Sequence, residues 1–175
     1  TPGVIVFPKC ENMRFHAGPT QSGGASKLWF CNLFDLSPDV MSDLVSKTTK
    51  FTKTPIFLPH LQGERAPIWE SKIKGMFYGL TAKTDRSELA RSVYEGVAFS
   101  AKWLLDTLEI SSRQNSEEIN CGGGGFQSDS WNQIRANILN KRLKRLKVKD
   151  PGILGAAALA AFGIGRYNSL KDSIN

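Results

Sequence analysis

The chain has 175 residues, of which 41% are hydrophobic and 22% charged, and its formal net charge at pH 7 is +7. The hydrophobic content excludes an intrinsically disordered chain, and the length favours one domain over residues 1–175. The longest nearly uninterrupted apolar or glycine run, residues 153–165, falls short of the roughly 20 residues of a membrane span, so we expect no membrane partner. Without an initiator methionine or a signal-peptide pattern, the chain is expected to be a piece of a longer, cytoplasmic protein.

The first predicted elements are two short helices and an edge strand. A pair of glycines precedes the apolar residues 25–34, which predict a short buried helix. Ser37 and Pro38 then have the residue types of a helix N-cap and first helical position, and they predict a helix up to about Lys47. The apolar run 55–59 between two prolines predicts a strand at a sheet edge. A loop should follow up to Gly75.

The longest helix is predicted to start at Asp85. Asp85 and Glu88 have the spacing of a capping box, in which each side chain accepts a hydrogen bond from a free backbone N–H group. About 24 residues at 1.5 Å each would make a rod of about 36 Å. The apolar residues at helical spacing are Leu89, Val93, Val97, Leu104 and Leu108. Val97 should therefore face the core, and Arg91 should pair with Glu95 near the surface.

The second half of the chain alternates between strand and helix patterns. Residues 117–121 predict a strand, the four glycines 122–125 a loop, and Trp131, Ile134 and Ile138 the apolar stripe of a helix. Residues 142–149 predict a second strand. The final helix, 153–164, has no polar face and is expected to pack against a sheet. This alternation indicates an α/β fold.

The cysteines and histidines suggest no catalytic or metal site. Cys10, Cys31 and Cys121 are odd in number and widely spaced, which fits neither a disulfide framework nor a zinc site. We expect free, mostly buried thiols in a reducing cytosol. His16 and His60 lack a serine or cysteine partner motif, and neither is expected to be catalytic.

The positive charge is concentrated in one segment. Residues 141–149 hold six basic side chains and no acidic one. This leaves open a non-enzymatic module that binds nucleic acid through the basic strand. No aromatic residue alternates with these cations, as a base-stacking surface would require. A solvent-exposed strand is therefore favoured, and nucleic acid is not an expected partner.

The run Gly122-Gly123-Gly124-Gly125 suits a phosphate site. Glycines let a ligand approach the backbone closely, and the N-terminus of the following helix would attract a phosphate group. No Gly-Lys-Ser/Thr follows, so the run is not a P-loop, and Gln127 replaces the third glycine of a dinucleotide fingerprint, which weakens a nicotinamide-dependent oxidoreductase. A tight structural turn remains the alternative.

Five segments, in order, resemble the FGGY family of carbohydrate kinases, most closely its xylulokinase and gluconokinase branches. They are Gln21-Ser-Gly-Gly-Ala-Ser26 through Trp29, Phe57 to Trp69 with its Gly63-Glu64-Arg65, Gly75 to Glu95, Gly122 to Gln133, and Leu154-Gly-Ala-Ala157. Within the second segment, Glu64 and Arg65 lie where a phosphate clamp could be built, but an ion pair between them that anchors the loop is favoured. Two positions depart from the family pattern. Some relatives have glutamine where this chain has Leu28, and aspartate is usual where this chain has Asn137.

The resemblance implies a fold and an activity. The expected fold is α/β of the actin-like ATPase, ribonuclease-H-like type, with a mixed sheet flanked by helices, as the partial second lobe of a two-domain kinase. Such a kinase phosphorylates a sugar or sugar acid (a pentulose, a hexulose or gluconate) with ATP. The N-terminal sugar-binding lobe, the catalytic base and most contacts to Mg²⁺ are expected outside this chain, which should be inactive alone. A homodimer is a further expectation.

The resemblance also assigns site residues. Gly24 in the early turn and Gly124 in the glycine loop, with its neighbours Gly123 and Gly125, are expected to lie against ATP or ADP. Ser128 should lie near the adenine end. No catalytic residue and no metal ligand is assigned within the chain.

Overall fold

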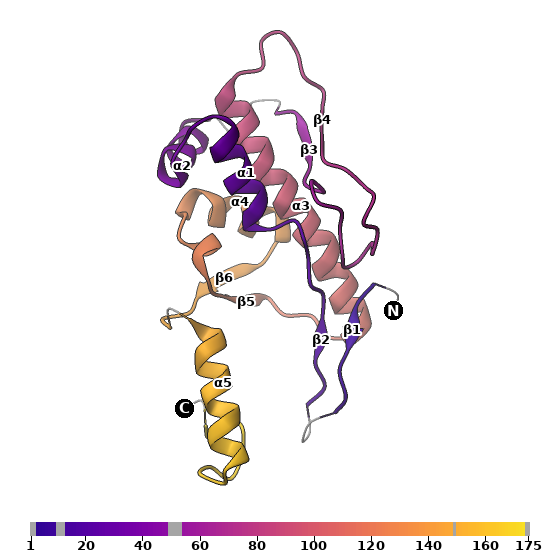
Figure 1. The fold of residues 1–175 in the computed structure, drawn as a ribbon, viewed down its shortest axis with the longest axis vertical. Helices are drawn as coiled ribbons and strands as arrows, with labels where there is room; N and C mark the ends of the chain where they lie inside the picture. Colours follow the sequence, from indigo (N-terminus) through magenta and orange to yellow (C-terminus); the bar gives the residue numbers. More distant parts are fainter. Residues whose placement is uncertain (1–2, 10–12, 49–53, 149, 174–175) are drawn as a thin grey trace.

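The computed structural model describes residues 3–9, 13–48, 54–148 and 150–173. It has the predicted alternation of helices and strands, arranged along the central helix α3 (Figure 1). The elements are β1 (Ile5–Val6), β2 (His16–Ala17), α1 (Gly24–Leu33), α2 (Pro38–Lys47), β3 (Ile56–Leu58), β4 (Met76–Tyr78), α3 (Arg86–Ser112), β5 (Glu118–Cys121), the 3-10 turn η1 (Gly124–Phe126), α4 (Asp129–Leu139), β6 (Arg142–Arg145) and α5 (Pro151–Gly163).

Helix starts lie where the sequence predicts them. Ser37 caps α2, accepting a hydrogen bond from the backbone N–H of Val40 at 3.3 Å. Asp85 caps α3 in a complete capping box with Glu88, and hydrogen bonds from the Ser87 side chain and the Glu88 backbone hold the pKa of Asp85 below its usual value. α3 runs for 27 residues, slightly longer than predicted.

The strands form three two-stranded sheets with both pairing directions. β1 with β2 and β3 with β4 are antiparallel, whereas β5 and β6 are parallel. The prediction of a strand over 142–149 was too long. β5 offers β6 four partner residues, from Glu118↔Arg142 to Cys121↔Arg145. The last backbone hydrogen bond between the two strands runs from the N–H of Leu146 to the carbonyl of Cys121, which is the last residue of β5. β6 therefore ends where its partner strand ends.

The core lies where α1, α2 and α4 meet α3. Phe30, Met41, Tyr94 and Trp131 are each 0% exposed. Tyr94 and Trp131 stack with ring centroids 4.4 Å apart, and the indole N–H of Trp131 donates to the carbonyl of Tyr94. Val97 is 5% exposed, as its place in the predicted stripe requires. Val93 and Val97 of the stripe thus face the core formed with the surrounding helices, whereas Leu104 lies against Gly18, next to β2.

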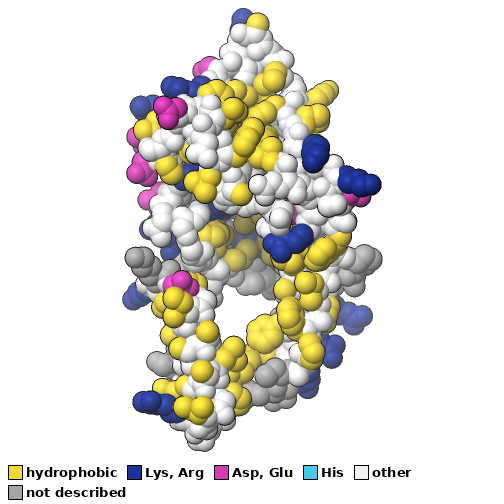
Figure 2. All heavy atoms as spheres, viewed as in Figure 1, with side chains coloured by type: hydrophobic (Ala, Val, Ile, Leu, Met, Phe, Trp, Pro, Cys, Tyr) yellow, Lys and Arg dark blue, Asp and Glu magenta, His cyan; other side chains and the backbone are white. Residues whose placement is uncertain are grey.

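Helix α5 departs from its prediction. Its side chains were expected to pack against a sheet, but Ala158 is the buried residue of the helix, while Ile153 and Leu159 are 69% and 58% exposed. α5 extends away from α3, and hydrophobic side chains border the open space in the lower half of the molecule (Figures 1 and 2). Apolar composition shows that a helix needs a covering surface, but not which one. No helix among the described residues is long and apolar enough to cross a membrane.

Candidate functional site

The glycine loop between β5 and α4 is open to solvent. Gly123 has φ of +90°, a conformation that only glycine adopts freely. A Cβ atom added to Gly124 would have no atom within 4 Å, so no neighbour in the protein requires glycine there. Among the described residues, the backbone N–H groups of Gly123, Gly124 and Gly125 find no hydrogen-bond acceptor. These donors are free to bind a ligand.

A polar pocket of about 410 Å³ opens between this loop and helices α1 and α2. Gly124 and Ser128 line it, whereas Gly24, Gly123 and Gly125 are not part of its wall. The N-terminus of the 11-residue helix α4 gives that side of the pocket a partial positive charge. The other lining residues are Lys27, Pro38, Asp39, Ser42, Asp43, Ser46, Gln127, Asp129 and Ser130.

Ser128 is the N-cap of α4. Its hydroxyl accepts a hydrogen bond from the backbone N–H of Trp131 at 3.3 Å and lies 3.0 Å from Ser42 Oγ. Ser42 Oγ is in turn 3.0 Å from the buried hydroxyl of Tyr94. Asp129 follows Ser128 as the first helical residue. The hydroxyl network therefore joins α2, α3 and α4 at one wall of the pocket.

Gly24 is the first residue of α1, the helix that lines the pocket through Lys27. A Cβ atom at Gly24 would also meet nothing within 4 Å. One turn later, Lys27 lines the pocket, with its ammonium nitrogen 5.9 Å and 5.8 Å from the ring centroids of Tyr94 and Trp131. Lys27 was not predicted, although it lies three residues after Gly24 and so on the same face of the helix.

Glu64 connects the loop after β3 to the entry of α1. Its carboxylate is buried and accepts hydrogen bonds from the backbone N–H groups of Gln21 at 2.6 Å and Arg65 at 2.9 Å and from the Thr20 hydroxyl at 3.0 Å. Arg65 does not form the predicted ion pair with Glu64, since its guanidinium donates to the carbonyl of Thr20 instead. The Gly-Glu-Arg motif thus holds the turn that begins α1.

Glu64 also makes the stability of this turn depend on pH. Burial opposes ionisation of its carboxyl, but the hydrogen bonds that it accepts outweigh burial and hold the pKa below 4.5. A carboxyl with a lowered folded-state pKa stabilises the fold above its unfolded pKa, and this contribution is lost as the pH falls through the folded value. We expect Glu64→Gln to lower the free energy of unfolding by about 1–3 kcal/mol at pH 7. The difference between the thermal midpoints of the two proteins should narrow as the pH falls below the ordinary pKa of a glutamate, and a constant difference would contradict this role.

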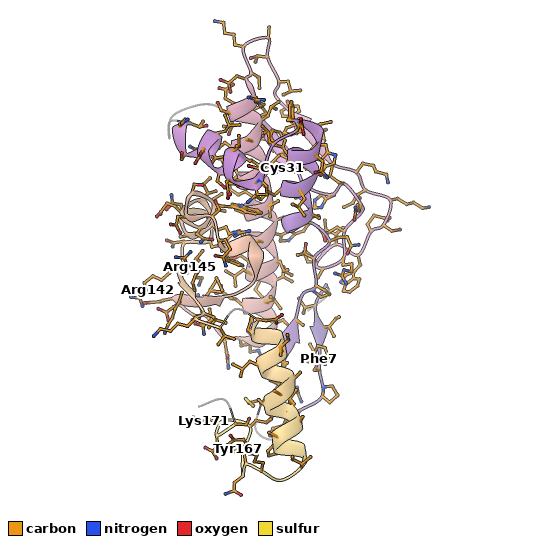
Figure 3. All side chains as sticks on the ribbon, turned by 60° about the vertical axis from the view of Figure 1, so that its left-hand side comes forward. Phe7, Cys31, Arg142, Arg145, Tyr167 and Lys171 are labelled. Carbon is orange, nitrogen blue, oxygen red and sulfur yellow. The ribbon has the colours of Figure 1, made fainter. Side chains whose placement is uncertain are left out.

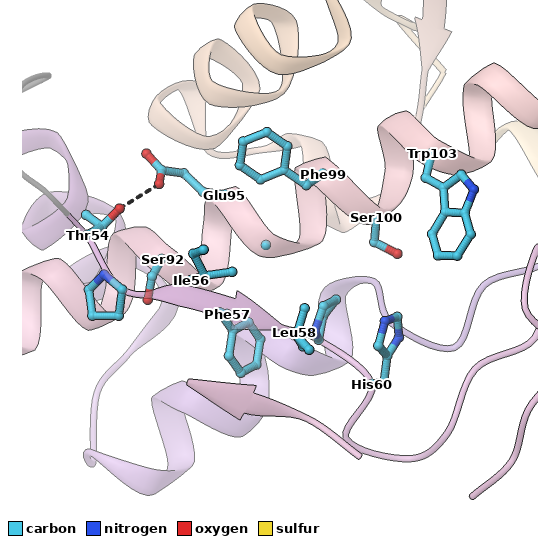
Figure 4. Close-up of a pocket in the computed structure, with 13 residues that line it drawn as sticks. Thr54, Ile56, Phe57, Leu58, His60, Ser92, Glu95, Phe99, Ser100 and Trp103 are labelled. Atoms are coloured by element: carbon cyan, nitrogen blue, oxygen red, sulfur yellow. Dashed lines mark hydrogen bonds between the residues drawn. The ribbon is translucent and has the colours of Figure 1, made fainter. Parts of the chain in front are cut away.

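An apolar groove lies elsewhere, between β3 and α3, with a volume of about 460 Å³ (Figure 4). Phe99 and Trp103 of α3 and Leu58 of β3 line it. Glu95 lies at one end and accepts hydrogen bonds from Arg91 Nε at 2.7 Å and from the Thr54 hydroxyl at 2.8 Å. The predicted Arg91–Glu95 pair is confirmed, and Glu95 has more partners than expected. The groove contains none of the predicted nucleotide residues.

The basic segment is largely paired with acidic side chains. Lys141 contacts Glu109 at 2.7 Å, and Arg142, Lys144 and Arg145 lie within 3.3–3.6 Å of carboxylates. Arg142 and Arg145 project from the edge of β6 (Figure 3). Most of these pairs are exposed and therefore weak, but they balance much of the local charge. Lys149 lies outside the described residues.

Cysteines and metal ligands add nothing to the site. Cys31 and Cys121 are free and buried, and burial raises the pKa of both thiols. Cys10 lies outside the described residues. His16 Nδ1 is 2.8 Å from Ser111 Oγ, which ties β2 to α3. Within the described ranges, no group of three or more His, Cys, Asp or Glu side chains could hold a metal ion.

Comparison with known proteins identifies the family. The model of the C-terminal domain of the FGGY family of carbohydrate kinases matches residues 19–164. The chain belongs to the FGGY family. It is 32% identical over 161 residues to a xylulose kinase from Staphylococcus epidermidis, covering 90% of this chain and 32% of that protein. The FGGY domain described here therefore spans about a third of the length of such relatives.

Solved FGGY kinases have the same fold. A gluconate kinase from Lactobacillus acidophilus aligns with a TM-score of 0.86 and 32% identity, over 98% of this chain and 35% of that one. A glycerol kinase from Plasmodium falciparum solved with ADP aligns with a TM-score of 0.81 and 27% identity, over 98% of this chain and 35% of that one. The predicted actin-like ATPase class is confirmed, with this chain as part of a domain.

Proposed function

We propose that this FGGY domain supplies the ATP- and ADP-binding side of a kinase that phosphorylates a sugar or sugar acid. The observation that carries the proposal is the glycine loop. Its free N–H groups stand at the N-terminus of α4, beside a polar pocket of about 410 Å³. Backbone donors and a helix N-terminus together are suited to phosphate groups.

The two walls of the pocket suit different parts of the nucleotide. Gly123, Gly124 and Gly125 would bind the phosphates through their N–H groups, and Lys27 would add positive charge. Asp39 and Asp43 line the pocket from α2, whereas Asp129 lines it beside the loop and pairs with Arg145 at 3.3 Å. Carboxylates repel phosphate but accept hydrogen bonds from hydroxyl and amino groups, so the α2 side of the pocket suits the ribose and base. Ser128, between the two walls, would lie near the adenine end, and Gly24 near the phosphates.

The proposed reaction moves the γ-phosphoryl group from ATP to a hydroxyl of the acceptor. The bond from the γ-phosphorus to the bridging oxygen breaks, ADP leaves with that oxygen, and a new bond forms to the acceptor hydroxyl, which loses its proton to a base. Such transfer depends mainly on positioning and on charge stabilisation, to which Mg²⁺ would contribute positive charge. The contribution of this domain is to hold the ADP portion still. The base and the Mg²⁺ contacts are assigned to the rest of the kinase.

The acceptor is proposed at the level of its class. Named relatives act on xylulose, gluconate or glycerol, as their names state. We propose a pentulose, a hexulose or gluconate, bound mainly by a first lobe that would also cover part of the exposed apolar surface of α5. The cytoplasmic location and the homodimer remain predictions.

The 175-residue chain alone is expected to transfer no phosphate. Without a second wall of the cleft, ATP and the acceptor hydroxyl are not held together, and the rate advantage of positioning is lost. A coupled ADP-release assay with pentuloses, hexuloses and gluconate tests this, next to a titration of the chain with ADP. Turnover by the chain near the ~10 s⁻¹ of a typical enzyme would contradict the division of labour. An ADP titration without binding would contradict the proposed nucleotide role.

A further inference from the structure

A buried arginine lies directly behind the glycine loop. Arg135 on α4 is 7% exposed, and burial lowers its pKa to about 10, so it stays charged at neutral pH. Its guanidinium carbon lies 3.7 Å from the ring centroid of Trp131 and 4.4 Å from that of Phe126. Among the described residues no carboxylate forms an ion pair with it. A buried cation without a carboxylate partner is costly and calls for another role.

The guanidinium binds the glycine loop itself. Arg135 Nη1 donates to the carbonyl oxygen of Gly125 at 2.7 Å. One turn earlier on α4, Asn132 Nδ2 donates to the carbonyl oxygen of Phe126 at 2.9 Å. Arg135 Nη1 also lies 3.4 Å from Asn132 Oδ1. Two consecutive carbonyl groups of the loop are therefore held by side chains of α4.

Holding these carbonyl groups restricts the orientation of the loop. In a planar trans peptide the carbonyl and the following N–H group point in opposite directions, so a fixed carbonyl oxygen fixes the whole peptide plane. The planes after Gly125 and Phe126 are both held from the α4 side. The N–H groups of these two planes, those of Phe126 and Gln127, donate to the carbonyls of Gly123 at 3.2 Å and Gly124 at 3.3 Å, so the peptides that carry the free N–H groups of Gly124 and Gly125 are held in turn. Glycine-rich backbone is otherwise the most mobile kind.

We propose that Arg135, with Asn132, is a positioning residue that keeps the glycine loop in its nucleotide-binding conformation. This proposal rests on the proposed nucleotide role of the loop. In this role Arg135 acts through the carbonyl of Gly125 and not by binding the nucleotide directly. The competing explanation is that Arg135 only packs α4 against Phe126 and Trp131, in which case the hydrogen bond to the loop would matter for folding alone.

The test uses the kinase that contains this chain and begins with Arg135→Met. Methionine can pack between the two rings but donates no hydrogen bond, and an apolar replacement of a buried charge is often compatible with folding. We expect the Michaelis constant for ATP to rise about tenfold, the factor that corresponds to about 1.4 kcal/mol. The Michaelis constant for the sugar should change by no more than about twofold, which corresponds to about 0.4 kcal/mol, because the sugar is expected on the other lobe. Arg135→Lys, which restores a charged donor, should recover part of the ATP affinity.

A matched control and a second variant keep the outcomes distinct. Arg142→Met makes the same change on β6, where the side chain is 74% exposed and pairs with Glu117, and it should leave both constants unchanged. An ATP constant unchanged in folded Arg135→Met overturns the proposal, and so does an equal rise in both constants, which marks a structural role. If Arg135→Met does not fold, Asn132→Ala decides: we expect a smaller rise in the ATP constant, and an unchanged one overturns the proposal. Wild-type protein that does not bind ADP would instead overturn the proposed function.

Discussion

Gly124→Val is expected to raise the Michaelis constant for ATP by about tenfold or more in the kinase that contains this chain, a loss of about 1.4 kcal/mol of binding free energy. The free N–H groups of the loop can meet phosphate oxygens only if the backbone comes within hydrogen-bond distance. A valine side chain at position 124 would occupy the space from which the ligand approaches. The constant for the sugar should change much less, because the sugar is expected on the other lobe.

The structure makes this prediction more specific than the sequence did. A side chain that merely disturbed a tight turn would destabilise the protein, but a Cβ atom at Gly124 meets no atom within 4 Å and its φ is not positive. The thermal midpoint should therefore stay close to that of the wild type. Gly155→Val, on α5 and equally free of neighbours, is the matched control and should leave ATP binding unchanged. A folded Gly124→Val protein with an unchanged ATP constant removes Gly124 from the site.

Val97→Asp is expected to unfold or aggregate the domain. Val97 is 5% exposed and belongs to the core cluster between α1, α2, α3 and α4. The described residues of this cluster would surround a new carboxylate mainly with apolar atoms. Burying such a group costs about 4 kcal/mol or more, a large part of the 5–15 kcal/mol that typically stabilises a domain. At 2–4 °C per kcal/mol, the thermal midpoint should fall by roughly 10 °C or the transition should be lost.

Phe99→Asp is the control for this substitution. It introduces the same carboxylate two residues later on α3, where the side chain is 60% exposed at the groove. Thermal unfolding followed by circular dichroism should give a midpoint near that of the wild type. Similar midpoints for Val97→Asp and Phe99→Asp would mean that the buried face of α3 has been assigned incorrectly.

The sequence is sufficient to predict where helices start and which family the chain resembles, because both depend on residues that are close together in the chain. Ser37 and Asp85 cap their helices with side chains that reach N–H groups two or three residues away. The ordered glycine and Gly-Glu-Arg segments were sufficient for the family resemblance. In the same way, four consecutive glycines before a helix pattern are sufficient to predict a candidate phosphate site.

The buried face of α4 needed the tertiary structure. The sequence predicted Trp131, Ile134 and Ile138 as its apolar stripe, whereas the buried residues are Trp131, Arg135 and Leu139. Those three positions also follow helical spacing, so periodicity alone could have placed a cation on the buried face. A rule that puts charges outside could not anticipate two aromatic rings and a loop carbonyl as partners for Arg135.

Local residue order is sufficient to predict the helices, their caps, the α/β alternation and the glycine loop, because each depends on residues that are neighbours in the chain. Tertiary structure decided which groups meet: Lys27 and Asp39 in one pocket with Gly124, Glu64 with the turn before α1, and Arg135 with Gly125. It also decided that β6 ends at Arg145, where its partner strand ends, and that α5 remains exposed. These outcomes depend on contacts between residues that are distant in the chain. Strand pairing and side-chain packing create such contacts, and local propensity does not predict them.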